Sequence, residues 1–311
     1  MQLPLDMRVP TPTLTQRRRF YDGGRPAVGT DPGEPPNPAA EPQIVLTRVE
    51  HDGEESFRLG RRIAYDDIEF GELLVPRDLE TWHTDLTSVP ALFTWLVPKT
   101  GAHLPAALVH DGLIWNPAKE TQSYTSTDGH TIVRFDADRV LRDAMRDTGT
   151  GAVRRWLVWS AVTAATMISG QGTGWTSLQR LRYRLPALLT ILTVVYLGYC
   201  ATSDLLDRHA WGAVGLPWMG DRSALLEIAG GLSGAVVIPL VLGLLWGRFV
   251  KAGWIVGITL AVLIHVTIAL AAVTLLYQAV EWLVKKAPRL VFGLGALIGV
   301  VATVLFVGLT W

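Results

Sequence analysis

Residues 185–203, LPALLTILTVVYLGYCATS, form a run of 19 positions without a charged side chain. Three comparable runs follow at 228–247, 252–280 and 290–311, with 20, 29 and 22 positions. A helix rises 1.5 Å per residue, so about 20 apolar residues cross the roughly 30 Å hydrocarbon layer of a bilayer. Together with tryptophans near the ends of the runs, this pattern predicts about four membrane-spanning helices, at 185–203, 225–247, 252–277 and 290–311.

The charged residues are concentrated in the other part of the chain. Of 28 Lys and Arg and 28 Asp and Glu residues, only 12 lie beyond Arg184, so residues 1–184 have the composition of a soluble domain. Because the net charge is zero, a nucleic-acid binder that depends on phosphate neutralisation is excluded. The single cysteine, Cys200, lies in the first apolar run and allows neither a disulfide framework nor a thiolate metal cluster.

The predicted fold class is an α+β soluble N-terminal domain followed by an all-α transmembrane bundle of about four helices. Prolines and glycines crowd the first 43 residues, which favours a disordered leader because such a segment buries little apolar surface. Beyond it, β-branched and apolar residues predict strands at 44–49, 57–65 and 68–75. Helical patterns follow at 104–111, 136–146 and 156–168, and the polar segment 116–129 is expected to be a loop. The chain thus divides into a Pro-rich leader (1–43), an α+β domain (44–170), a linker (171–184) and a transmembrane region (185–311).

The orientation in the membrane is not decided by the loop charges. With four spans, five basic residues lie on the side of the N-terminal domain and five on the opposite side, so the positive-inside rule gives no preference. No apolar export signal precedes the soluble domain. We therefore expect a multi-pass protein of the cell membrane with its N-terminal domain and its C-terminus in the cytoplasm.

The densest group of polar residues lies between Trp82 and Asp138. A histidine followed by an aspartate, His110-Asp111, falls within a predicted helix, and an imidazole and a carboxylate suit divalent transition metals that activate water. One hypothesis is therefore a metal site formed by His110, Asp111 and Asp138, with Asp85, His110 and Asp111 as the catalytic residues. His83 and His103 are further candidate ligands.

Two other interpretations of the same residues remain open. In the first, the Asp85 carboxylate caps a turn through the backbone amides of Thr87 and Ser88, and His110 and Asp111 hydrogen-bond to it in a buried structural network. In the second, the residues form a metal-free acid–base or binding site. A nucleophilic serine is not indicated, because Ser88 lacks the G-x-S-x-G context, and no phosphate-binding loop motif occurs.

The order of several short motifs resembles a known family. It is the small phage-associated family classified as the domain of unknown function numbered 1353, and the resemblance covers about residues 44–170. The matching motifs are Val75-Pro76, Thr84-Asp85 with Ser88-Val89-Pro90, Ala106-Ala107 with His110-Asp111, and Ala137-Asp138 with Ala144-Met145. This sequence departs from the pattern by extra residues before Thr84 and by a polar insertion at 116–133. The resemblance implies candidate positions and a phage or prophage origin, but no established activity.

These observations lead to one leading hypothesis and two alternatives. The leading one is a membrane-anchored module of phage or prophage origin that binds a protein partner through its N-terminal domain, or acts at the cell envelope. The first alternative is a hydrolase that depends on a divalent metal at His110 and Asp111. The second is a small transporter or channel, with His265 as the mid-span polar residue. The bilayer is a partner under each of them, and nucleic acid under none.

Overall fold

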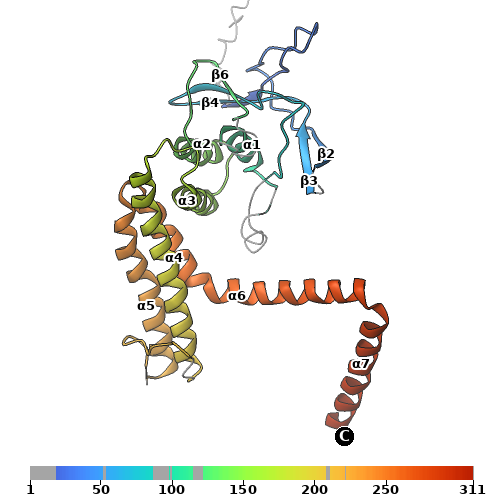
Figure 1. The fold of residues 1–311 in the computed structure, drawn as a ribbon, viewed down its shortest axis with the longest axis vertical. Coiled ribbons are helices and arrows are strands. Elements are labelled where there is room, and N and C mark those ends of the chain that lie inside the picture. Colours follow the sequence, from blue (N-terminus) through green and yellow to red (C-terminus); the bar gives the residue numbers. More distant parts are fainter. Residues whose placement is uncertain are drawn as a thin grey trace, which may run out of the picture. The chain divides into compact units, whose positions relative to one another are not determined.

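The computed structural model describes residues 19–51, 54–86, 98, 100–114, 122–207, 211–220 and 222–310 (Figure 1). The chain divides into two compact units, Met1–Ala261 and Val262–Trp311. Among the described residues, the first unit holds the sheets, five α-helices, one short 3-10 helix and the start of α6 (Val250–Lys286). The second holds the remainder of α6 and helix α7 (Pro288–Thr310).

A small antiparallel sheet forms the base of the N-terminal domain. Its strand order is β1-β4-β5-β6, and a separate hairpin consists of β2 (Leu46–His51) and β3 (Glu54–Leu59). The four strands of the sheet are β1 (Phe20–Asp22), β4 (Ile63–Asp67), β5 (Gly71–Val75) and β6 (Thr125–Ser126). Every residue of β4 is buried, because β4 is an inner strand that is also covered by helices. The segment predicted as one strand at 57–65 contains the end of β3 and the start of β4, which are two separate strands in the structure.

Strand β1 corrects the prediction of a disordered leader for residues 20–22. Tyr21 is fully buried, pairs with Ala64 of β4 and donates its hydroxyl hydrogen bond to Glu72. Downstream of β1, the proline-rich segment folds back through a bridge between Arg25 and Glu34. Composition misled the prediction here, because an apolar pair of residues inside a proline-rich stretch is enough to complete the edge of a sheet.

The domain has three helices in its described residues, of which the first two pack on the sheet and the third packs on the second: α1 (Leu104–Leu113), α2 (Arg134–Asp147) and α3 (Ala152–Ser169). Helix α1 lies against β4 and β5, α2 against α1 and β4, and α3 against α2. Gly112 allows the close approach of α1 to β5, since a Cβ atom at this position would lie 2.3 Å from Val75 Cγ1. The predicted α+β domain followed by a helical region is thus confirmed.

The helical region begins earlier than predicted. Helix α4 (Ser177–Leu205) follows a capping box in which Thr176 and Gln179 bond each other's backbone amides. Much of the predicted linker 171–184 is therefore the first part of a helix. After α4 come α5 (Ala224–Gly243), the short helix η2 (Leu244–Phe249) and α6.

In the described residues, two helical stretches rather than the predicted four are long and apolar enough to cross a membrane. They are Ser177–Leu205 and Ala224–Val266. The two middle apolar runs were predicted as separate spans, but α5, η2 and the start of α6 follow one another without a polar loop between them. Helix α7 covers the fourth run without being one of these two stretches.

An aromatic cluster joins the α/β domain to the apolar helices within the first unit. Ala164 and Met167 of α3 pack with Trp246 and Phe249 of η2 in a buried core. Trp246 donates a hydrogen bond of 2.9 Å from Nε1 to Thr190 Oγ1 on α4. Since these contacts are buried and include a satisfied polar pair, a second core, separate from that of the sheet, joins α3 to the apolar helices.

Candidate functional site

Helix α1 positions His110 at the edge of the domain core. The helix buries Ala106, Leu108 and Val109 against the sheet, while the His110 side chain lies on another face and keeps 12% of its surface exposed. Asp111 follows on the same helix and is partly exposed. Because consecutive helical residues are about 100° apart around the axis, the two side chains of the predicted His-Asp pair leave α1 in different directions.

The side chain of His110 contacts a buried carboxylate on α2, that of Asp138. Nε2 of His110 lies 2.9 Å from Oδ1 of Asp138, whose side chain is only 1% exposed. The second carboxylate oxygen, Oδ2, accepts a hydrogen bond of 2.7 Å from the hydroxyl of Thr166 on α3. We name His110, Asp138 and Thr166 the three-helix network, because each residue comes from a different helix.

The geometry of the three-helix network fits a structural role. Burying a carboxylate is unfavourable unless its oxygens are hydrogen-bonded, and both oxygens of Asp138 have a partner. Asp138 in turn fixes the orientation of the His110 ring. The network therefore fixes the positions of α1, α2 and α3 relative to one another where the three helices meet.

The other predicted site residues have separate surroundings. Asp85 lies on the exposed surface just after the bridge between Thr84 and Phe57. The turn there is capped by Thr84, whose Oγ1 accepts a hydrogen bond of 2.9 Å from the amide of Leu86. The predicted bonds from Asp85 to the amides of Thr87 and Ser88 lie outside the described residues.

The two further histidines contact backbone carbonyl groups. The ring of His83 lies 3.2 Å from the carbonyl oxygen of Thr81. His103 is buried, and its Nε2 lies 2.9 Å from the carbonyl oxygen of Pro98. Burial lowers the pKa of His103 below its ordinary value, against the opposing effect of the Pro98 carbonyl. Within the part of the chain that the structure describes, no group of three or more His, Cys, Asp or Glu residues could hold a metal ion.

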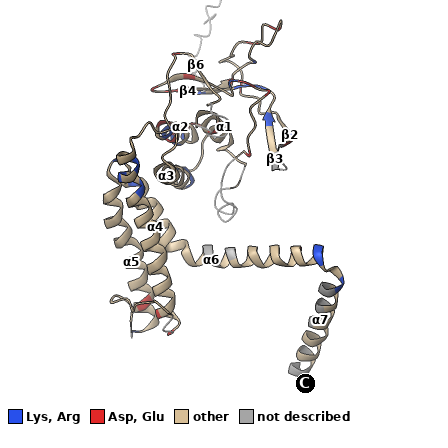
Figure 2. Cartoon of the chain, viewed as in Figure 1, with Lys and Arg blue, Asp and Glu red and all other residues tan. Residues whose placement is uncertain are grey.

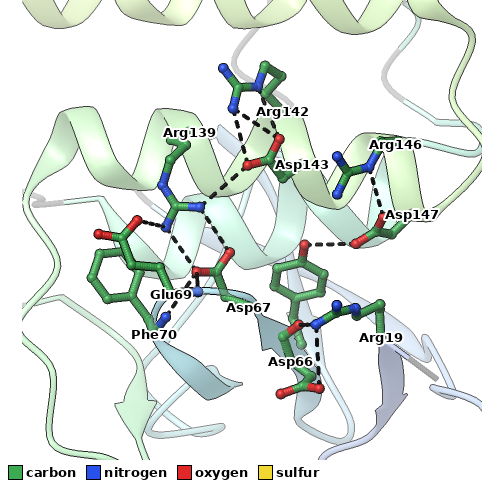
Figure 3. A network of polar contacts seen from close by, with 11 residues as sticks. Arg19, Asp66, Asp67, Glu69, Phe70, Arg139, Arg142, Asp143, Arg146 and Asp147 are labelled. Carbon is green, nitrogen blue, oxygen red and sulfur yellow. Dashed lines mark hydrogen bonds and ion pairs between the residues drawn. The ribbon is translucent and has the colours of Figure 1, made fainter. Parts of the chain in front are cut away.

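A second polar network connects the β4–β5 turn to helix α2 (Figure 3). Arg139 on α2 binds Asp67 with Nη2 2.9 Å from Oδ1, and it also lies 3.2 Å from Glu69 and 3.4 Å from Asp143. The amides of Glu69 and Phe70 donate to the same carboxylate of Asp67 at 3.0 and 3.1 Å. This ion pair fixes α2 on the sheet, since the Asp67 side chain is fully buried.

The electrostatics of Asp67 follow from these contacts. Burial acts to raise the pKa of Asp67, but the hydrogen bonds from Arg139 and from the two amides outweigh it, so the pKa lies below its ordinary value of 3.8. Nearby, burial and the carboxylate of Asp147 raise the pKa of Tyr65, whose hydroxyl donates to Asp147 at 3.1 Å. Asp67 is therefore charged and Tyr65 neutral over the whole physiological range.

Neither Thr166 nor the pairing of Asp67 with Arg139 was predicted from the sequence. A threonine in an apolar helix carries no local signature, so Thr166 could not be singled out. Asp67 lies between the strands predicted at 57–65 and 68–75, where it was assigned no role in a site. The spacing of Arg139 and Asp143, one helical turn apart, was the available signal for a charged face on α2.

Comparison with known proteins supports the family assignment. Residues 57–162 match the family model described as "Protein of unknown function (DUF1353)", which is the family that the sequence motifs resemble. The match runs from within β3 to within α3 and covers roughly a third of the 311 residues. Comparisons with the curated proteins and with the solved structures gave no match. His110, Asp138, Asp67 and Arg139 lie inside the matched segment, and Thr166 lies just beyond it.

Proposed function

We propose that this chain is a membrane-anchored binding module of a phage-type family. Its α/β domain is held at the cytoplasmic surface of the cell membrane by α4 and by the stretch Ala224–Val266. The observation that carries the proposal is the apolar surface of these helices. Large aliphatic side chains remain exposed along them, including Leu189, Leu192, Val195, Leu232, Val237 and Val241. A contiguous apolar surface of this kind is unfavourable in water and matches the interior of a bilayer.

The distribution of charge on the two ends of the helices supports the orientation (Figure 2). The end next to the α/β domain carries five basic residues, which we name the proximal basic cluster: Arg180, Arg182, Arg184, Arg248 and Lys251. The segment that joins α4 to α5, which we name the distal connection (residues 206–223), has only two basic residues in its sequence, Arg208 and Arg222, and the acidic Asp204, Asp207 and Glu227 lie in it or flank it. With two spans instead of four, the count of basic residues is no longer balanced. The positive-inside rule then favours a cytoplasmic domain.

Topology mapping tests this proposal. A reporter fused after Arg184 is expected to lie in the cytoplasm, and one fused near Gly215 is expected to lie on the opposite side. The full chain should remain in the membrane pellet after extraction with alkaline carbonate. Finding both reporters on one side, or the chain in the carbonate supernatant, would contradict the anchoring by a pair of crossings.

We propose binding rather than metal-dependent hydrolysis for the domain because the ring of His110 is already hydrogen-bonded within the protein. Its Nε2 is engaged by Asp138, and coordination of a metal through this nitrogen would replace the hydrogen bond that joins α1 to α2. The hydrolase alternative rests on His110 and Asp111 as metal ligands, with Asp138, whose Oδ1 lies 2.9 Å from Nε2 of His110, as a third.

Metal analysis separates the two alternatives. The purified full chain is expected to contain far less than one equivalent of any divalent metal after passage over a desalting column. A stoichiometric metal that is lost in His110→Ala, with the melting temperature unchanged, would favour the hydrolase. The variant Asp85→Ala serves as a control, because Asp85 lies on the exposed surface.

A further inference from the structure

The proximal basic cluster carries charges that no ion pair in the described residues neutralises, although Arg248 has an attractive carboxylate charge near it, that of Asp136. In the described part of the chain, none of its five residues forms an ion pair with a carboxylate, whereas Arg61, Arg139 and Arg146 of the α/β domain all do. Five cations gathered at the ends of neighbouring helices repel one another unless anions are supplied from outside. The cluster is thus a surface complementary to negative charge.

Aromatic rings hold two of these guanidinium groups in place. The ring of Tyr183 lies 5.9 Å from the guanidinium carbon of Arg182 on α4 and 5.8 Å from that of Arg248 on η2. Arg248 also lies 4.1 Å from the ring of Phe135 and 4.7 Å from that of Phe249. Such stacking orients the planar group and leaves its edge N–H groups available for oxygen acceptors.

The position of the cluster at the start of a candidate membrane span indicates which kind of anion it binds. Arg180, Arg182 and Arg184 occupy the first two turns of α4, where this candidate span begins. Arg180 is tied to the preceding turn by a hydrogen bond of 3.2 Å from Nε to the carbonyl oxygen of Trp175. Tyr183, which is only partly buried, packs with its ring centroid 4.5 Å from the buried ring of Trp175, and an amphipathic ring at the start of a span prefers the headgroup region of a bilayer.

We infer that the proximal basic cluster binds the phosphate groups of anionic phospholipids in the cytoplasmic leaflet. The inference rests on the proposed membrane anchoring and adds to it a lipid class. Arginine binds phosphate oxygens through paired, charge-assisted hydrogen bonds. The headgroups thereby neutralise the cluster and seal the junction between α3, α4 and η2.

The test uses the full chain reconstituted in vesicles of phosphatidylcholine mixed with phosphatidylglycerol, followed by mild detergent extraction and analysis of the lipids that remain bound. Phosphatidylglycerol is expected to be enriched about fivefold over its share in the vesicle, the factor that corresponds to a single basic residue at an anionic surface. The variant R184Q/K251Q should at least halve the enrichment. Both side chains are exposed and have no hydrogen bond or ion pair in the described residues, so folding is expected to be intact.

Two matched variants serve as controls. R208Q/R222Q removes two charges from the distal connection and should leave the enrichment unchanged, and R184K/K251R keeps both charges and should retain it. Phosphatidylglycerol at its bulk share around the wild-type chain would overturn the inference, as would an equal loss in R208Q/R222Q. Displacement of the lipid by inorganic phosphate, but not by chloride of equal ionic strength, would assign the site to free phosphate and also overturn it.

Alkaline carbonate extraction of the same vesicles distinguishes the two proposals. A wild-type chain that stays in the pellet without enriched phosphatidylglycerol overturns the headgroup site alone. A wild-type chain that is extracted overturns the anchoring, and the headgroup site with it. Retention of R184Q/K251Q in the pellet with reduced enrichment supports both.

Discussion

Asp138→Ala is expected to lower the free energy of unfolding of the α/β domain by on the order of 4 kcal/mol. The substitution removes the acceptor of two hydrogen bonds and leaves His110 and Thr166 without their partner at a buried position. Each group left unsatisfied costs about 1–3 kcal/mol. The measurement is the melting temperature of the full chain in mild detergent, followed by tryptophan fluorescence.

Two comparisons make the Asp138 result specific to the three-helix network. Thr166→Val preserves the shape of the side chain and removes one hydrogen bond, so a smaller loss of about 1 kcal/mol is expected. Glu50→Ala should change stability least, because Glu50 is exposed and its side chain forms no hydrogen bond or ion pair in the described residues. If Asp138→Ala left the melting temperature unchanged or raised it, the network would not be structural and a ligand site would be favoured.

Asp67→Asn is expected to have the second largest effect. The substitution keeps an acceptor for the amides of Glu69 and Phe70 but removes the charge that Arg139 meets in a buried ion pair. Breaking such a pair costs about 3–5 kcal/mol, and the lower value applies here because Arg139 stays 23% exposed and retains Glu69 and Asp143. The melting temperature at neutral pH measures the loss.

The same residue predicts an acid dependence. Because the pKa of Asp67 is lower in the folded chain than its ordinary 3.8, its stabilising contribution is complete at neutral pH and is lost as the pH falls below about 4. The wild-type chain should therefore lose more stability between pH 5 and pH 3 than Asp67→Asn. Glu50→Gln is the control, because Glu50 is exposed and its side chain forms no hydrogen bond or ion pair in the described residues. Equal acid sensitivity of wild type and Asp67→Asn would count against the role of the Arg139 pair.

Local patterns in the sequence identified the elements of the domain better than the contacts between them. Helix α1 was found because Pro105 lies in its first turn, followed by good helix formers. His110 and Asp138 were both singled out as polar residues on helices. Their contact, and the pairing of Asp67 with Arg139, join residues 28 and 72 positions apart. Such pairs depend on how helices pack on the sheet, which no local period encodes.

The number of spans illustrates a different limit. Hydropathy marks apolar runs but does not show whether the chain between two runs forms a loop. Arg248 and Lys251 divide the second run from the third in the sequence, although both lie in a helical stretch in the structure. Gly247, with a φ of 58° and a ψ of −122°, is the non-helical residue there. Two charged residues that separate two apolar runs in the sequence can therefore lie within one helical stretch of the structure.

The bond from Thr166 to Asp138 bears on where this domain can be cut. The family match ends at residue 162, so a fragment trimmed to that limit would lose Thr166 and strand one oxygen of a buried carboxylate. A fragment extended to Gly170 would keep the bond but expose Ala164 and Met167, whose neighbours come from α4 and η2. Transplanting the fold into another protein would therefore require part of its anchor as well, because α3 belongs to both.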